Sequence, residues 1–181
     1  MKLCRVGWVG RALVTAVVAV GLWYGWESRA DAGVTVRIEP TGDALELEIP
    51  TDIGPQKDQI PLYRQGSIRY FSSGIGLVER EADYPPFSLK LVFTAGGKPF
   101  VTGVAITVRD AKGTTVLTVP AEHITGPWLF IDLPDGTYEV SATLGGQVQV
   151  AKGIKLGRGK VTTQHVRWSE DRSPRLTASG E

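Results

Sequence analysis

Few residues of this chain have the chemistry of a catalytic or metal site. The two histidines are His123, beside Glu122 in the segment AEHITGPW, and His165, in the segment TTQHVRW. Imidazole and carboxylate groups serve as metal ligands and general bases, so these three residues are the candidates for a metal site or a small hydrolase. No short H-x-H or H-x-x-x-H spacing links them, so such a site requires a fold that brings distant residues together.

Other reactive motifs are missing or incomplete. The chain has no G-x-S-x-G nucleophile elbow, and its only cysteine is Cys4. Gly74-x-Gly76 is typical of a phosphate loop, but no Lys-Ser or Lys-Thr pair follows it, and Glu79 would repel a phosphate. We therefore expect no enzyme activity, no metal and no cofactor.

The segment SSGIGLVERE, residues 72–81, interrupts a chain of alternating strands. Its glycines permit a sharp bend, and we expect Ile75 and Leu77 to hold that bend against the core. Glu79, Arg80 and Glu81 are expected in solvent, where Arg80 could hold a carboxylate of another molecule. Among the surfaces of the protein, this segment is the first candidate for contact with a protein partner.

Two tryptophans suggest a sugar-binding alternative, because flat aromatic rings stack on sugar rings. Trp128 precedes the apolar run Leu129–Ile131, so we expect it in the core. Trp168 ends a strand before a polar segment, which leaves open a core position or an exposed platform. His165 lies on the face opposite Trp168, so we expect His165 to point outward.

The first 32 residues have the pattern of an export signal. Basic residues precede the uncharged stretch ALVTAVVAVGLWYGW, and Ala30-Asp31-Ala32 forms a small-x-small cleavage motif before Gly33. We expect cleavage between Ala32 and Gly33, with a retained membrane anchor as the alternative. The predicted location is the bacterial periplasm or the cell exterior, with no membrane span after cleavage.

The charge balance bears on partners. The 181 residues have a formal net charge of +1, which becomes about −1 without residues 1–32. A nearly neutral domain has no electrostatic footprint for nucleic acid, so we expect no such partner.

The remaining residues predict an all-β protein. Apolar residues alternate with polar ones over 34–38, 45–49, 104–109 and 138–144, and turn signals recur every eight to twelve residues. This pattern favours an antiparallel β-sandwich over residues 87–168, with a parallel sheet not expected. Residues 33–86 are expected to form a hairpin, a linker or irregular loop over 50–66 and a short helix near 77–84. Residues 169–181 are expected to be a disordered tail.

Three segments of the sandwich region resemble the carboxypeptidase regulatory-like domain, a transthyretin-like (prealbumin-like) β-sandwich. They are the opening Gly97-Lys98-Pro99-Phe100, the strand Val104–Val108 and the segment LPDGTYEV, residues 133–140. The resemblance implies a fold in which Tyr138 buries its ring and bonds the backbone, and a domain that lacks catalytic residues. The chain after residue 32 also resembles small exported bacterial proteins that carry such a domain. It departs from the enzymes that gave the domain its name, because we expect no peptidase domain in it.

Some enzymes of this fold end in a Y-R-G-S motif or hold iron with two tyrosines and two histidines. This sequence ends in TASGE, and its tyrosines are not ordered that way around the histidines. The first hypothesis is thus a non-catalytic, exported module that contacts an envelope protein. The alternatives are a carbohydrate- or peptidoglycan-binding module that uses Trp168, and a hydrolase or metal site at His123 and His165.

Overall fold

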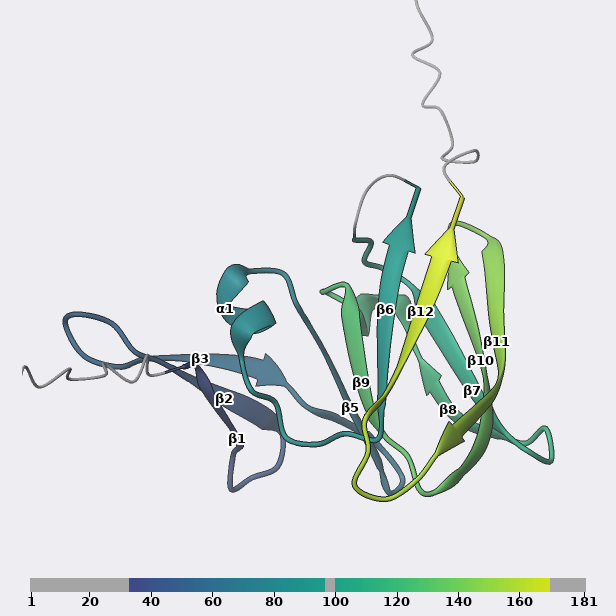
Figure 1. The fold of residues 1–181 in the computed structure, drawn as a ribbon, viewed down its shortest axis with the longest axis horizontal. Coiled ribbons are helices and arrows are strands. Elements are labelled where there is room, and N and C mark those ends of the chain that lie inside the picture. The colour runs from purple at the N-terminus through teal and green to yellow at the C-terminus, as the bar shows by residue number, and fades with distance from the viewer. Residues whose placement is uncertain (1–32, 97–99, 170–181) are drawn as a thin grey trace, which may run out of the picture. The chain divides into compact units, whose positions relative to one another are not determined.

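The computed structural model describes residues 33–96 and 100–169. The predicted signal segment before Gly33, the residues Gly97–Pro99 of the family-like opening, and the predicted tail from residue 170 onward lie outside the described residues. In the described part, the protein is mostly β-structure, as the alternating pattern predicted. Its strands form three sheets (Figure 1).

Two of these sheets form the sandwich. The four-stranded sheet has the order β11-β10-β7-β8. Its strands are β7 (Ala105–Asp110), β8 (Thr115–Val119), β10 (Gly136–Leu144) and β11 (Gln147–Leu156). Gly145 and Gly146 join β10 to β11 with φ of 55° and 79°, which is the two-residue turn with positive φ that matches strand twist.

The five-stranded sheet has the order β12-β6-β9-β5-β4. Its strands are β4 (Tyr63–Gln65), β5 (Ile68–Ser73), β6 (Leu89–Ala95), β9 (Trp128–Asp132) and β12 (Thr162–Trp168). The helix α1 (Leu77–Glu81) connects β5 to β6, and the 3-10 helix η1 (Ala121–His123) connects β8 to β9. Because β4 and β5 belong to this sheet, the sandwich includes residues 63–73 and does not start at residue 87 as predicted.

A third sheet covers the outer side of the five-stranded sheet. Its order is β1-β2-β3, with β1 (Thr35–Ile38), β2 (Ala44–Ile49) and β3 (Gln56–Pro61) all antiparallel. The predicted hairpin is therefore confirmed in β1 and β2. The predicted irregular loop over 50–66 is wrong, because β3 and β4 lie there. Four exposed polar residues at the start of β3 hid its strand character, since only Ile60 of that strand is buried.

The main core lies between the two sandwich sheets and is mostly aliphatic. Its buried residues come from both sheets and from Ile124, which follows η1, and include Leu89, Leu91, Val108, Val140 and Leu129. Tyr138 lies 7% exposed at this core and donates a hydrogen bond from its hydroxyl to the Pro134 carbonyl, 3.0 Å away. That bond fixes the turn before β10, as expected from the LPDGTY segment.

A second core lies between the three-stranded and five-stranded sheets. Its buried members are Leu45, Leu47, Ile60, Leu62, Phe71, Phe87 and Phe130. Strand β9 is consequently buried on both faces: Leu129 and Ile131 point into the main core and Phe130 into the second. A strand buried on both faces reads as a continuous apolar run, which explains the sequence WLFI.

Two features of the strands differ from a simple alternating, antiparallel arrangement. Phe87 does not share a face with Leu89 and Leu91, because it precedes β6 and packs in the second core. Strand β12 also pairs parallel to β6, from Thr162↔Leu89 to Trp168↔Ala95. A parallel pair needs no intervening helix here, because β12 reaches the five-stranded sheet by crossing over from β11 of the other sheet.

Candidate functional site

The segment between β5 and β6 makes a tight bend followed by α1, and residues 74–81 are called the α1 corner below. Gly74 has φ of 98°, a conformation that favours glycine. A Cβ atom at Gly74 would lie 2.9 Å from the Trp128 ring, so a larger residue would collide with that ring. The ring therefore supports the backbone of the corner. Lys90 makes a cation–π contact with the same ring, because its Nζ lies 3.4 Å from the Trp128 ring centroid.

Two charged side chains of the helix bind the backbone of the bend. Glu79 accepts hydrogen bonds at Oε2 from the backbone N–H of Gly74 (2.6 Å) and of Ile75 (3.2 Å). Arg80 donates from Nε to the Gly74 carbonyl (3.0 Å) and from Nη2 to the Ile75 carbonyl (3.3 Å). Glu79 stands three residues after the N-cap Gly76, the position from which a glutamate reaches back to free N–H groups.

Arg80 is exposed, as predicted, whereas Glu79 is half-buried. The sequence did not predict that both side chains bind the backbone of the bend. The Arg80 guanidinium also lies over the Phe100 ring, 4.7 Å from its centroid. Only Glu81, of the three charged residues singled out, is exposed without such a role.

The apolar residues of the α1 corner point the other way from the prediction. Ile75 is 59% exposed and Leu77 is 68% exposed, so neither holds the bend against the core. Val78 and Trp128 instead pack against the second core. The bend thus exposes the Ile75 and Leu77 side chains to solvent, while Glu79 and Arg80 bind its backbone.

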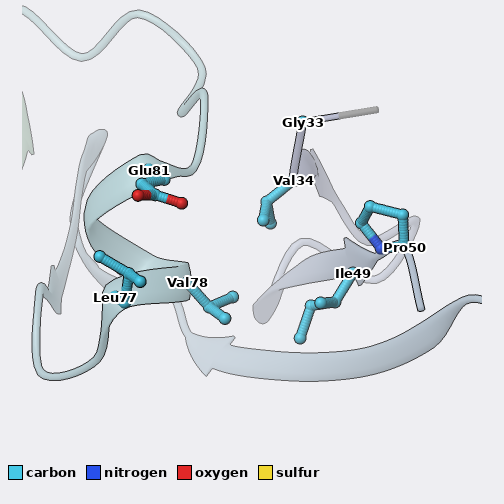
Figure 2. Close-up of a pocket in the computed structure, with 7 residues that line it drawn as sticks. All are labelled: Gly33, Val34, Ile49, Pro50, Leu77, Val78 and Glu81. Atoms are coloured by element: carbon cyan, nitrogen blue, oxygen red, sulfur yellow. The ribbon is translucent and has the colours of Figure 1, made fainter. Parts of the chain in front are cut away.

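A hollow lies beside the corner. It has a volume of about 330 Å³ and is lined by Gly33, Val34, Ile49, Pro50, Leu77, Val78 and Glu81. Figure 2 shows Val34, Ile49 and Val78 pointing into the space between the helix and the three-stranded sheet, with the Glu81 carboxylate beside it. The walls are therefore apolar, with one carboxylate.

Buried hydroxyl groups lie under the corner. Ser73 Oγ and Tyr84 Oη are both shielded from solvent, and neither has a hydrogen bond with good geometry among the described residues. Burial raises the pKa of Tyr84 to about 12; the neighbouring Ser73 hydroxyl opposes this shift, and the charge of Glu79 adds to it. Tyr84 therefore stays neutral at physiological pH.

Trp168 is not an exposed platform. It is 2% exposed in the main core, and its Nε1 donates a hydrogen bond to the Gln147 carbonyl, 3.3 Å away. The sequence left open a core position or an exposed platform for Trp168, and the structure has the core position. The prediction that Trp168 belongs to an interaction surface is therefore wrong. Trp128, expected in the core, is half-buried.

The fold does not bring the two histidines together. His165 is exposed, as predicted, on β12 at one edge of the five-stranded sheet, whereas His123 contacts β4 and β5 at the opposite edge. The His123 ring stacks on Tyr63 with centroids 3.8 Å apart, and its Nδ1 lies 3.0 Å from the Tyr70 hydroxyl. Within residues 33–96 and 100–169, no group of three or more His, Cys, Asp or Glu side chains is placed to hold a metal ion.

Sequence reasoning missed this stack of His123, Tyr63 and Tyr70, as well as the hollow beside α1. The stack joins η1 to β4, a strand that was predicted as loop, so no sequence signal placed its members together. The sequence gives only a weak indication of the hollow: two of its lining residues, Val34 and Ile49, are apolar residues at the ends of alternating segments.

Comparisons with protein-family models, curated proteins and solved structures find no significant match for this chain. The resemblance to the carboxypeptidase regulatory-like domain consequently stays a prediction. Among the described residues, none of the helices has the length and apolar character needed to cross a membrane.

Proposed function

We propose that this protein is an exported, non-catalytic β-sandwich module that binds another protein of the bacterial envelope through the α1 corner. The observation that carries the proposal is the exposure of Ile75 and Leu77 on a bend whose backbone is bound by Glu79 and Arg80. Exposed apolar side chains next to a hollow are features of protein-binding surfaces. The proposed location rests on the signal-like pattern of residues 1–32.

Rigidity of the corner adds to the case. A loop that is already ordered loses little conformational entropy when a partner binds, so more of the contact energy appears as affinity. Fully burying an aliphatic side chain contributes roughly 1.5–3 kcal/mol. Ile75 and Leu77 therefore suffice to dominate a modest interface.

The type of sandwich is part of the proposal. We propose the transthyretin-like form, supported by the buried Tyr138, its bond to Pro134 and the strand that follows. The carbohydrate-binding alternative loses its platform, because Trp168 is buried. The hydrolase or metal alternative lacks a suitable geometry, because His165 lies on β12 at one edge of the five-stranded sheet and His123 contacts β4 at the other edge.

A site-specific photo-crosslinking experiment tests the proposed contact. A photoreactive amino acid replaces Ile75 in one variant of the full chain and Val148 in another, and both are expressed in cells that export the protein. Val148 is the matched control, because it is 56% exposed on β11 of the other sandwich sheet. We expect a discrete crosslinked protein from position 75 and none from position 148.

Competition then tests whether the contact depends on apolar burial. Ile75→Ser should weaken capture of the crosslinked protein by about tenfold, since each 1.4 kcal/mol is a factor of ten. Val148→Ser should leave capture unchanged. No crosslink at position 75, or equal crosslinks at both positions, would count against the proposed function.

A further inference from the structure

The hollow beside the α1 corner has a chemical character more specific than an apolar surface. Its apolar walls come from three places in the chain: Val34 just before β1, Ile49 at the end of β2 with Pro50 after it, and Leu77 with Val78 on α1. At about 330 Å³ it is at the small end of the range of ligand pockets, roughly 300–1,000 Å³. That size suits one or two side chains of a partner rather than a large cofactor.

The charges around the hollow are negative. Glu81 lies on its wall and makes no hydrogen bond or ion pair with a described residue. Asp83 is exposed and its backbone N–H bonds the carbonyl of Val34, 3.4 Å away, so a second carboxyl-bearing residue adjoins the same wall. Residues 33–86 as a whole contain nine acidic and five basic residues.

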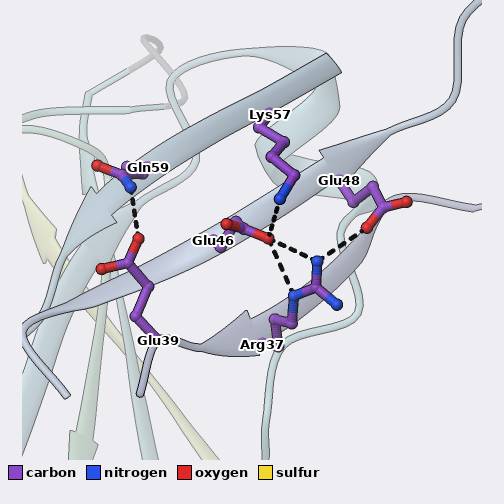
Figure 3. A network of polar contacts seen from close by, with 6 residues as sticks. All are labelled: Arg37, Glu39, Glu46, Glu48, Lys57 and Gln59. Carbon is purple, nitrogen blue, oxygen red and sulfur yellow. Dashed lines mark hydrogen bonds and ion pairs between the residues drawn. The ribbon is translucent and has the colours of Figure 1, made fainter. Parts of the chain in front are cut away.

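Basic side chains of the three-stranded sheet and of α1 are already engaged. Figure 3 shows Arg37 and Lys57 of the three-stranded sheet both bound to Glu46, with Arg37 also bound to Glu48. Arg80 is bound to the backbone of the bend. Hence no described cation next to the hollow neutralises Glu81.

We infer that the hollow receives an apolar side chain of the partner protein and that a lysine or arginine next to it in the partner pairs with Glu81. The inference rests on the proposed function and specifies the partner's chemistry. The apolar walls supply the affinity, and a charge-assisted hydrogen bond to Glu81 supplies the preference for a basic neighbour. An acidic neighbour is repelled by Glu81 and Asp83, which gives specificity by exclusion.

Defined peptides test this inference without knowledge of the partner. The ¹⁵N-labelled full chain is titrated with blocked hexapeptides of sequence Gly-Ser-Leu-Lys-Ser-Gly, Gly-Ser-Leu-Glu-Ser-Gly and Gly-Ser-Ser-Lys-Ser-Gly. We expect saturable amide shifts at Gly33, Val34 and Leu77–Glu81 with the Leu-Lys peptide. The Leu-Glu and Ser-Lys peptides should bind at least about threefold more weakly, in the range that one lost contact of this kind produces.

A charge variant shows whether Glu81 is responsible. Glu81→Gln should weaken binding of the Leu-Lys peptide about threefold and reduce its advantage over the Leu-Glu peptide. Glu122→Gln is the control, because Glu122 is an exposed carboxylate on η1. Absence of saturable shifts at these amides, or equal affinity for the Leu-Lys and Leu-Glu peptides, overturns the inference.

The two proposals fail in different ways. Crosslinking at position 75 together with no peptide binding removes only the inference about the hollow. Peptide binding as expected, together with no crosslink at position 75, removes the proposed contact through the exposed side chains and leaves the hollow as a peptide-binding site.

Discussion

The main core and the second core differ in size and in the kind of side chain that fills them. The main core joins two sheets through many aliphatic residues, whereas the second core has seven buried members and contains a cluster of aromatic rings. Phe71 stacks on Phe130 with centroids 4.7 Å apart, and the edge of Phe87 packs on Phe71 at 5.0 Å. Because the three-stranded sheet and the α1 corner pack on this small cluster, the proposed binding surface depends on far fewer contacts than the sandwich does.

This difference suggests that the molecule unfolds in two steps of unequal stability. Elements with few buried contacts open locally at lower free energy than the elements of the main core. The α1 corner packs on the second core through Val78, so its order depends on this less stable layer. The following substitutions compare the two layers directly.

The largest effect is expected in the main core. Leu129 on β9 is 0% exposed and packs between the sandwich sheets. Leu129→Ala should lower the free energy of unfolding by roughly 3–5 kcal/mol, because a buried leucine leaves a cavity as well as losing burial. Chemical denaturation followed by far-ultraviolet circular dichroism measures this loss. A loss below about 1 kcal/mol would show that the site is not a packed core position.

The same substitution in the second core should act locally. Leu47 on β2 is also 0% exposed, so Leu47→Ala is matched to Leu129→Ala in residue type and burial. We expect a loss of roughly 2–3 kcal/mol for opening of the three-stranded sheet. Hydrogen exchange should accelerate at amides of β1–β3 and stay unchanged in β7 and β10. Equal acceleration in all five strands would mean that the two cores unfold as one unit.

The strands of the main core were largely predictable from the sequence, since period-two alternation exposes one face and buries the other. That rule located β7, β10 and the hairpin of β1 and β2. It fails for β3, where only Ile60 is buried. Alternation also does not indicate which sheet a strand joins. The parallel pairing of β12 with β6 and the burial of Phe87 in the second core could therefore not be predicted from the sequence. Pairing between distant strands has no local signal.

The candidate site was only partly predictable. The sequence identified the bend through its glycines and selected Ile75, Glu79, Arg80 and Glu81 as a surface. It placed Ile75 against the core, whereas Ile75 is exposed, and it missed the bonds from Glu79 and Arg80 to the backbone. Here backbone groups of the sharp bend take their hydrogen bonds from the Glu79 and Arg80 side chains, because buried groups left without partners would be costly. Short-range hydrogen bonds of this kind follow from three-dimensional geometry.

Two tyrosines give a smaller contrast between the cores. Tyr138→Phe removes the bond to the Pro134 carbonyl and should cost about 1 kcal/mol of unfolding free energy. Tyr84→Phe in the second core removes a buried hydroxyl that lacks a partner, so it should be neutral or slightly stabilising. Thermal denaturation of both variants measures the difference. A larger loss from Tyr84→Phe would indicate that its hydroxyl is hydrogen-bonded in solution.

The smallest effect is expected on the exposed face of the three-stranded sheet. The hydrogen bond from Arg37, followed by that from Lys57, lowers the pKa of Glu46 below its ordinary value of 4.5 (Figure 3). A lowered pKa in the folded state means that the ionised carboxylate stabilises the fold above pH 4.5, and that this contribution disappears as the pH falls through the lowered pKa. The denaturation midpoint of the wild-type protein should therefore exceed that of Glu46→Gln at neutral pH and approach it in acid.

The dependence of this midpoint difference on pH and salt distinguishes ionic stabilisation by Glu46 from side-chain packing. Exposed ion pairs contribute little and are screened by salt, so the difference should shrink at high ionic strength as well as at low pH. Glu122→Gln, on η1 beside the sandwich, provides the control and should show no difference from wild type at either pH. If Glu46→Gln stays less stable than wild type in acid and at high salt, the network is not the cause. The three-stranded sheet would then depend on the contacts of its side chains rather than on their charges.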